Sequence, residues 1–118
     1  MTLYLYGLVA AGRRLPRGMK GVAGEKVRSL KLGSLGALAS PIGGELALDL
    51  DDLGAHAAVV EAAFAKGPIL PFRAGTVVEE DVLRNEVALY LPDYEAQLAE
   101  LDGLCELEVT AWYREEPV

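Results

Sequence analysis

The sequence contains a single cysteine, Cys105, and a single histidine, His56. One cysteine cannot form a disulfide within the chain, and a metal site needs three or more converging ligands. The sequence therefore excludes a disulfide framework and a cysteine-based zinc cluster, and it predicts neither a metal nor a cofactor. A lone thiol fits a reducing compartment, which favours a cytoplasmic location.

Long hydrophobic runs are also missing. No stretch reaches the length that a membrane-spanning helix needs. The apolar residues 3–11 have no Lys or Arg before them, and their alternating pattern with two tyrosines is typical of a strand rather than of a signal peptide. We therefore expect no membrane association.

Basic residues are scarce after position 31. Residues 1–31 hold seven basic groups and one acid, whereas residues 32–118 hold four basic and seventeen acidic groups. The net charge of −7 argues against nonspecific binding to nucleic acid. Four basic residues fall in a predicted glycine-containing loop over 11–24. They are candidate electrostatic contacts to an acidic partner or to a second copy of the chain, unless nearby acids neutralise them within the domain: Arg13, Arg14, Arg17 and Lys20.

The length of 118 residues fits one domain, but the composition is unusually apolar. Hydrophobic residues make up 52% of the chain, and the mean hydropathy is +0.23. Two explanations are open: an alanine-rich core, or surface that a partner covers.

Alternation and turn residues predict five strands. Residues 2–10 are apolar on both faces, which is typical of a central strand, and Gly33-Ser34 predicts a hairpin turn. Pro71 confines its strand to a sheet edge or a strand end. The predicted strands cover residues 2–10, 25–32, 35–40, 69–72 and 104–113.

Helical periodicity appears in two regions. The first follows Asp49, whose position and charge suit a helix cap, and stops before Gly67-Pro68. Its predicted buried face is Leu50, Leu53, Ala57, Val60 and Phe64. The second region covers about 79–102, is kinked by Pro92 and ends at Gly103. This order of elements predicts a single α+β domain over residues 1–118, a ferredoxin-like variant with a mostly antiparallel sheet and helices packed on one face.

No catalytic constellation emerges from the residues. His56 could pair with Asp52 one helical turn earlier or activate Cys105, but nothing in the sequence brings either group to it, and a boundary histidine is the simpler interpretation. Arg73 closes an apolar strand, so its guanidinium either anchors the strand to the acidic start of the next helix or contacts a partner. We therefore predict a protein that is not an enzyme.

Four stretches carry a resemblance to a known family: LYLYGLVA, GMKGVAGEKVRSLKLGSLGALASPI, HAAVVEAAFAKGPILPFRAGTVV and LDGLCELEVTAWY. In this order they resemble the first domain of the GvpF/GvpL family of gas vesicle accessory proteins. The third stretch is the most specific. The family signature falls there on His56, Pro68, Leu70, Pro71, Arg73, Gly75 and Thr76.

The chain departs from the family pattern in two ways. Ala74 stands where members usually have Phe, and members are usually about twice as long, with a second α/β domain. The resemblance implies a non-enzymatic accessory or minor structural protein, cytoplasmic or on the gas vesicle. It would bind the main shell protein during assembly, with other vesicle accessory proteins as further partners. The candidate partner contacts or structural anchors are His56, Pro71, Arg73, Gly75 and Thr76.

Other classes of function remain open beside this one. Small ferredoxin-like domains also occur as dimeric enzymes of the monooxygenase type, as ligand-binding regulatory domains and as oligomerisation modules. An enzyme would need a pocket with converging polar groups, for instance His56 with a tyrosine.

Overall fold

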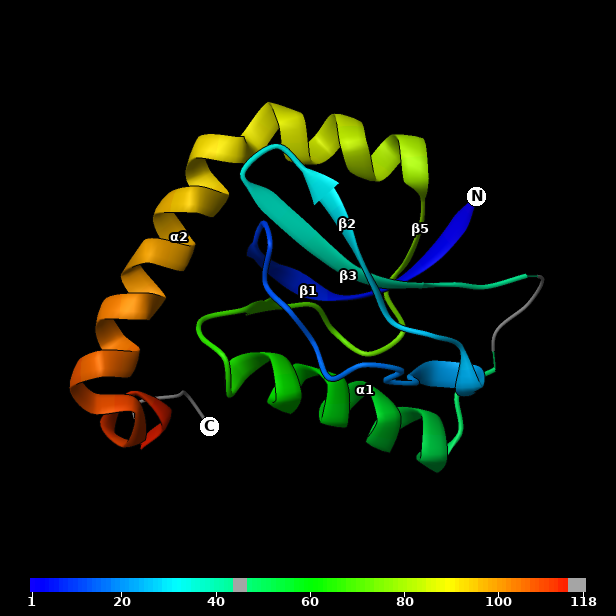
Figure 1. Ribbon diagram of the computed structural model, residues 1–118, viewed down its shortest axis with the longest axis horizontal. Coiled ribbons are helices and arrows are strands. Elements are labelled where there is room, and N and C mark those ends of the chain that lie inside the picture. The colour runs from blue at the N-terminus through cyan, green and yellow to red at the C-terminus, as the bar shows by residue number, and fades with distance from the viewer. Residues whose placement is uncertain (44–46, 115–118) are drawn as a thin grey trace.

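The computed structural model describes residues 1–43 and 47–114, with side chains described as far as Leu101. In this part of the chain, five strands form one sheet and two long helices pack on it (Figure 1). The strands are β1 (Thr2–Ala10), β2 (Arg28–Leu32), β3 (Leu35–Pro41), β4 (Leu70–Pro71) and β5 (Val77–Glu79). The helices are α1 (Leu50–Phe64), α2 (Glu80–Arg114) and a short 3-10 turn, η1 (Val22–Gly24).

Strand β1 is the centre of the sheet. It pairs with β3 along one side and with β4 and β5 along the other, and β2 continues the sheet beyond β3. All of these pairings are antiparallel. The residues from Leu3 to Val9 are buried, which confirms the predicted central strand. The α+β class and the hairpin at Gly33-Ser34 are confirmed as well.

The two helices cover opposite faces of the sheet. Tyr4, Tyr6 and Val9 of β1 belong to a core cluster with residues of α1, whereas Leu3, Leu5 and Leu8 of β1 cluster with residues of α2. A register shift between Leu5 and Gly7 places Leu8 on the same face as Leu5. We expected both helices on one face; a central strand that is apolar on both sides requires cover on both.

Helix α1 begins as predicted, but it buries a different stripe. The Asp49 carboxylate caps the helix by accepting from the Asp52 backbone, and the Asp52 carboxylate accepts from the Asp49 backbone. The predicted stripe was wrong in its first half, because Leu50 is 85% exposed, Leu53 is 44% exposed and Ala57 is exposed as well. The buried residues of α1 are His56, Val59 and Ala63.

The physical reason is the alanine content of α1. With alanines around most of the helix, several stripes are apolar enough to face the sheet, and periodicity alone does not choose between them. The stripe that faces the sheet contains His56, whose ring nitrogens contact the hydroxyl of Tyr4 in β1 and the carbonyl of Phe72 just after β4.

Helix α2 extends through the region predicted as the last strand. It changes direction in its yellow part in Figure 1, near Pro92, and then continues to Arg114. The strand prediction for 104–113 was therefore wrong, and Gly103 does not end the helix. Extending an existing helix adds one hydrogen bond for each residue that is ordered, and here this local extension prevails over pairing with a distant strand. A glycine in the helix interior costs only about 1 kcal/mol.

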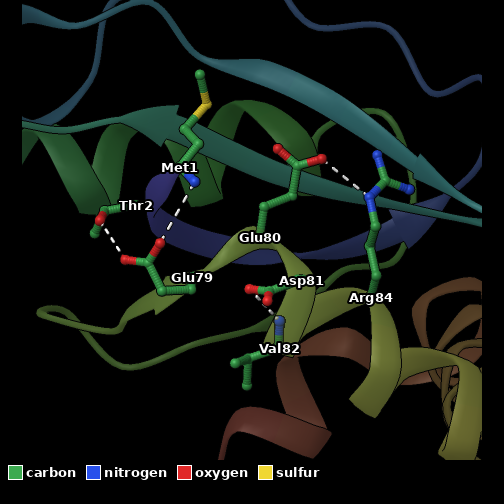
Figure 2. Close-up of polar contacts among 7 residues, drawn as sticks. All are labelled: Met1, Thr2, Glu79, Glu80, Asp81, Val82 and Arg84. Carbon is green, nitrogen blue, oxygen red and sulfur yellow. Dashed lines mark hydrogen bonds and ion pairs between the residues drawn. The ribbon is translucent and has the colours of Figure 1, made fainter.

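The junction between β5 and α2 is fixed to the beginning of β1. Figure 2 shows the Glu79 carboxylate between the Thr2 hydroxyl, which donates to it, and the Met1 ammonium 3.4 Å away. These two contacts, with the Thr2 hydrogen bond as the larger cause, hold the pKa of Glu79 below its ordinary value. One turn into α2, the Arg84 guanidinium lies 3.0 Å from the Glu80 carboxylate.

Candidate functional site

The signature stretch forms a closed turn after β4. The Arg73 carbonyl accepts hydrogen bonds from the Thr76 backbone at 3.2 Å and from the Thr76 hydroxyl at 2.7 Å. Gly75 has φ +94°, a conformation that glycine adopts readily and other residues rarely adopt. Thr76 therefore closes this turn, and the residues after it form β5.

The His56 side chain of α1 supports this turn through a hydrogen bond. It is 7% exposed, and its Nε2 lies 3.0 Å from the Phe72 carbonyl oxygen. A carbonyl only accepts, so Nε2 carries the proton and donates. Nδ1 then accepts from the Tyr4 hydroxyl at 2.8 Å. Both ring nitrogens are thus engaged, and the neutral Nε2–H tautomer satisfies both contacts.

Tyr4 connects His56 to the turn. Its hydroxyl donates to His56 and accepts the Gly75 backbone N–H at 2.9 Å. The Tyr4 ring lies edge-on to the His56 ring, with centroids 5.6 Å apart. Burial raises the pKa of the Tyr4 hydroxyl, and the Gly75 hydrogen bond offsets part of this rise. One side chain of β1 therefore fixes both the imidazole and the turn.

Tyr6 anchors a second segment from the same strand. Its hydroxyl lies 2.8 Å from Ser40 Oγ and accepts the Val22 backbone N–H at 3.0 Å. Because Ser40 Oγ donates to the Lys26 carbonyl at 2.9 Å, the Tyr6 hydroxyl donates to Ser40. Burial raises the pKa of Tyr6. The Tyr6 ring packs 5.0 Å from Tyr4 and 5.5 Å from His56, centroid to centroid.

Arg73 projects from the turn that these contacts hold. Its side chain is exposed, and the described residues give its guanidinium no hydrogen bond and no ion pair. We expected a pair with the acidic start of the following helix as one of two options. In the structure, Glu79 and Glu80 at that start pair with the Met1 ammonium and Arg84 instead. The turn is held by contacts of His56, Gly75 and Thr76, and the Arg73 side chain contributes no described contact to it.

The four basic residues predicted as electrostatic contacts differ in exposure and in hydrogen bonding. Arg14, Arg17 and Lys20 are exposed, whereas Arg13 is half-buried. The Arg13 guanidinium donates to the Ala63 carbonyl at 3.3 Å, in the last turn of α1. A cation at this end of a helix is favourable because the helix dipole is negative there. Arg13 thus has a structural role.

The hydrogen bonds around His56 hold the signature turn in place. The pair with Asp52, which the helical spacing allowed, does not form; Asp52 instead accepts from the Ala23 backbone at 3.0 Å and from the Asp49 backbone. These backbone hydrogen bonds lower the pKa of Asp52. The side chain of Cys105 lies outside the described residues. Among residues 1–43 and 47–101, no group of three metal-ligating side chains converges.

Sequence reasoning missed the two tyrosines. Tyr4 and Tyr6 were counted only as strand residues, although they alternate on one face of the central strand. Buried tyrosine hydroxyls need partners, and the only histidine of the chain stands on a helix that had to cover this strand. Together, these two facts could have predicted a hydrogen bond between a tyrosine of the strand and His56.

Comparison with known proteins identifies the family and the fold. The family model described as gas vesicle synthesis protein GvpL/GvpF matches residues 2–118. The chain belongs to the GvpL/GvpF family. A curated relative, gas vesicle protein F from Streptomyces sp. (strain CB03234), is 34% identical over 126 residues, which cover 100% of this chain and 51% of the relative.

Two solved structures of GvpF share the fold. The crystal structure of gas vesicle protein GvpF from Anabaena sp. PCC7120 has a TM-score of 0.71 at 26% identity, and that of GvpF from Microcystis aeruginosa has 0.71 at 27%. Each match covers 86% of this chain and 44% of the other. This GvpL/GvpF chain thus spans about half the length of the relatives it matches. Among the described residues, no helix is both long and apolar enough to cross a membrane.

Proposed function

We propose that this protein acts in gas vesicle assembly by binding the main shell protein, without catalysing a reaction. The observation that carries the proposal is Arg73, an exposed arginine without an intramolecular partner among the described residues, on a turn whose backbone is fixed by buried side chains. A guanidinium presented in this way loses little further freedom when it binds a carboxylate or carbonyl oxygens.

Exposed apolar residues support a protein partner. Leu50 is 85% exposed, Leu89 is 71% exposed and Val82 is 50% exposed. The composition, with 52% hydrophobic residues, allowed two explanations, and these side chains favour the one in which a partner covers part of the surface. We further propose that residues 1–118 correspond to the first domain of the longer relatives and work in the cytoplasm at the growing vesicle.

A binding measurement with matched arginine variants tests the proposal. Purified shell protein is immobilised, and the wild-type chain is compared with Arg73→Ala and with Arg84→Ala, an exposed arginine of α2. Losing a hydrogen bond to a charged group costs about 1.5–3 kcal/mol, so Arg73→Ala should weaken binding about 10- to 150-fold. Arg84→Ala should bind like wild type. Both should unfold within about 0.5 kcal/mol of wild type.

Two results would contradict the proposal. If the wild-type chain does not bind the shell protein under conditions where a full-length relative binds it, the partner is wrong. If Arg73→Ala binds normally but unfolds several degrees earlier, Arg73 is a structural anchor. Binding only to a second copy of the chain, seen by sedimentation, would favour an oligomerisation module.

A further inference from the structure

An open hollow lies between the loop after β1 and strand β2. It encloses about 410 Å³, and its lining consists of Ala11, Gly12, Arg13, Ser29 and Lys31. Two of these five residues are cations, one carries a hydroxyl, and none is acidic. The chemistry of the lining is that of a site for negatively charged oxygens.

The two cations differ in how they are held. The Arg13 guanidinium is restrained by its hydrogen bond to the Ala63 carbonyl, so its position on one side of the hollow is defined. Lys31 is exposed on β2 and can adjust to a ligand. Between them, Gly12 has φ +86°, and no atom lies within 4 Å of the point where a Cβ would stand. The loop backbone at Gly12 is therefore open to close approach by a ligand.

The surface around the hollow keeps its positive charge. Among the described residues, no ion pair involves Arg14, Arg17, Lys20, Lys26, Arg28 or Lys31. Lys20 and Lys26 are even direct partners in an antiparallel bridge, an arrangement of like charges that is destabilising. Within the described part of the chain, these six cations are therefore not paired with acids of the same domain, which is the alternative that the sequence left open for the basic loop.

Strand β2 also ends the sheet. It pairs with β3 on one side, and no described strand lies on its other side. The exposed Arg28, Ser29 and Lys31 follow this edge. Lysines on an edge strand discourage pairing with another apolar strand, but they attract an extended segment that carries carboxylates.

We propose that the hollow and the adjoining edge of β2 bind an acidic, extended segment of a partner protein. One carboxylate of the segment lies between Arg13 and Lys31, and its backbone runs along β2. A free phosphate is the weaker candidate, because the exposed polar side chains of β2 extend beyond the lining of the hollow to Arg28, and a small ion would leave that residue without a contact. This proposal goes beyond the shell-binding function and does not depend on Arg73.

The experiment is an NMR titration of the ¹⁵N-labelled chain with the peptide hexaglutamate. We expect shifts at the amides of Gly12, Ser29 and Lys31, and weaker binding as salt rises. Lys31→Glu should weaken binding about tenfold, because it replaces a charge-assisted contact by repulsion. Arg84→Glu changes the net charge equally on α2 and should change the affinity less than twofold. Lys31→Gln, a milder change, should fall between wild type and Lys31→Glu.

Each other result overturns the proposal. Equal weakening by Lys31→Glu and Arg84→Glu would mean bulk charge attraction without a site. Shifts at the same amides with inorganic phosphate but not with hexaglutamate would assign the hollow to a small anion. Shifts at these amides when the protein alone is concentrated would assign it to a second copy. Absence of any shift with hexaglutamate at low salt would remove the site, whatever the shell-binding measurement with Arg73 shows.

Discussion

Replacing His56 with phenylalanine tests whether the histidine fixes the signature turn. The substitution keeps a buried aromatic ring at this point of α1 and removes both ring nitrogens. The Phe72 carbonyl then loses the donor that now lies 3.0 Å away, and the Tyr4 hydroxyl loses its acceptor at 2.8 Å. Both groups stay in the space between α1 and the sheet.

The expected cost follows from these two stranded groups. A buried donor or acceptor without a partner costs about 1–3 kcal/mol, so His56→Phe should lower the free energy of unfolding by about 2–5 kcal/mol. The free energy of unfolding of a domain of this size is about 5–15 kcal/mol, so a protein that loses this amount still folds in most cases. The melting temperature should fall by about 4 °C for each kcal/mol.

A double-mutant cycle in urea gives the decisive measurement. Tyr4→Phe strands the Gly75 backbone N–H and His56 Nδ1. The double variant should cost about 1 kcal/mol less than the two single costs together, because both remove the same hydrogen bond. Tyr90→Phe, at a 46% exposed tyrosine of α2, is the matched control and should change nothing. A His56→Phe protein with the wild-type urea midpoint, or a cycle without coupling, would refute the network.

Three further predictions concern other parts of the core. Gly21→Ala should destabilise the protein by about 1–3 kcal/mol in urea, since its methyl group would overlap the Tyr6 hydroxyl; a wild-type midpoint would contradict this packing. Burial raises the pKa values of Tyr4 and Tyr6 above 10.0, so both side chains should keep their protons past pH 10. Their contribution to the free energy of unfolding is complete below about pH 10 and is lost as the pH rises through the pKa values of the folded protein. Absorbance at 295 nm would follow the ionisation, and urea midpoints would follow the stability. Arg13→Ala should cost about 1 kcal/mol of stability by uncapping α1, whereas Arg14→Ala should melt like wild type; equal melting temperatures would rule out the capping role.

The sequence predicted the elements that local rules control. The alternation in residues 2–10, the glycine turn at Gly33 and the Asp49 cap all depend on neighbours within a few positions, and all are confirmed. The prediction failed where the outcome depends on distant partners. Residues 104–113 alternate like a strand, but pairing with a distant strand competes with extension of the helix that precedes them, and α2 continues there instead.

The candidate site was predictable in its residues but not in its geometry. The signature named His56, Gly75 and Thr76, and the positive φ of Gly75 agrees with the turn that glycine favours. No local pattern could show that Tyr4 reaches both His56 and Gly75, because that contact requires the register of β1 against α1. The different roles of Arg13 and its basic neighbours likewise depend on where the end of α1 lies.

The contacts that fix the signature turn join residues far apart in the chain. Tyr4 and His56 are separated by 52 positions, and Tyr4 and Gly75 by 71. During synthesis, the turn leaves the ribosome after both of its supports, and it takes its final shape only when β1 and α1 have docked, a late and nonlocal event in folding. A nascent or misfolded copy lacks this shape. A partner that reads Arg73 in its fixed position would therefore select finished molecules and ignore incomplete ones.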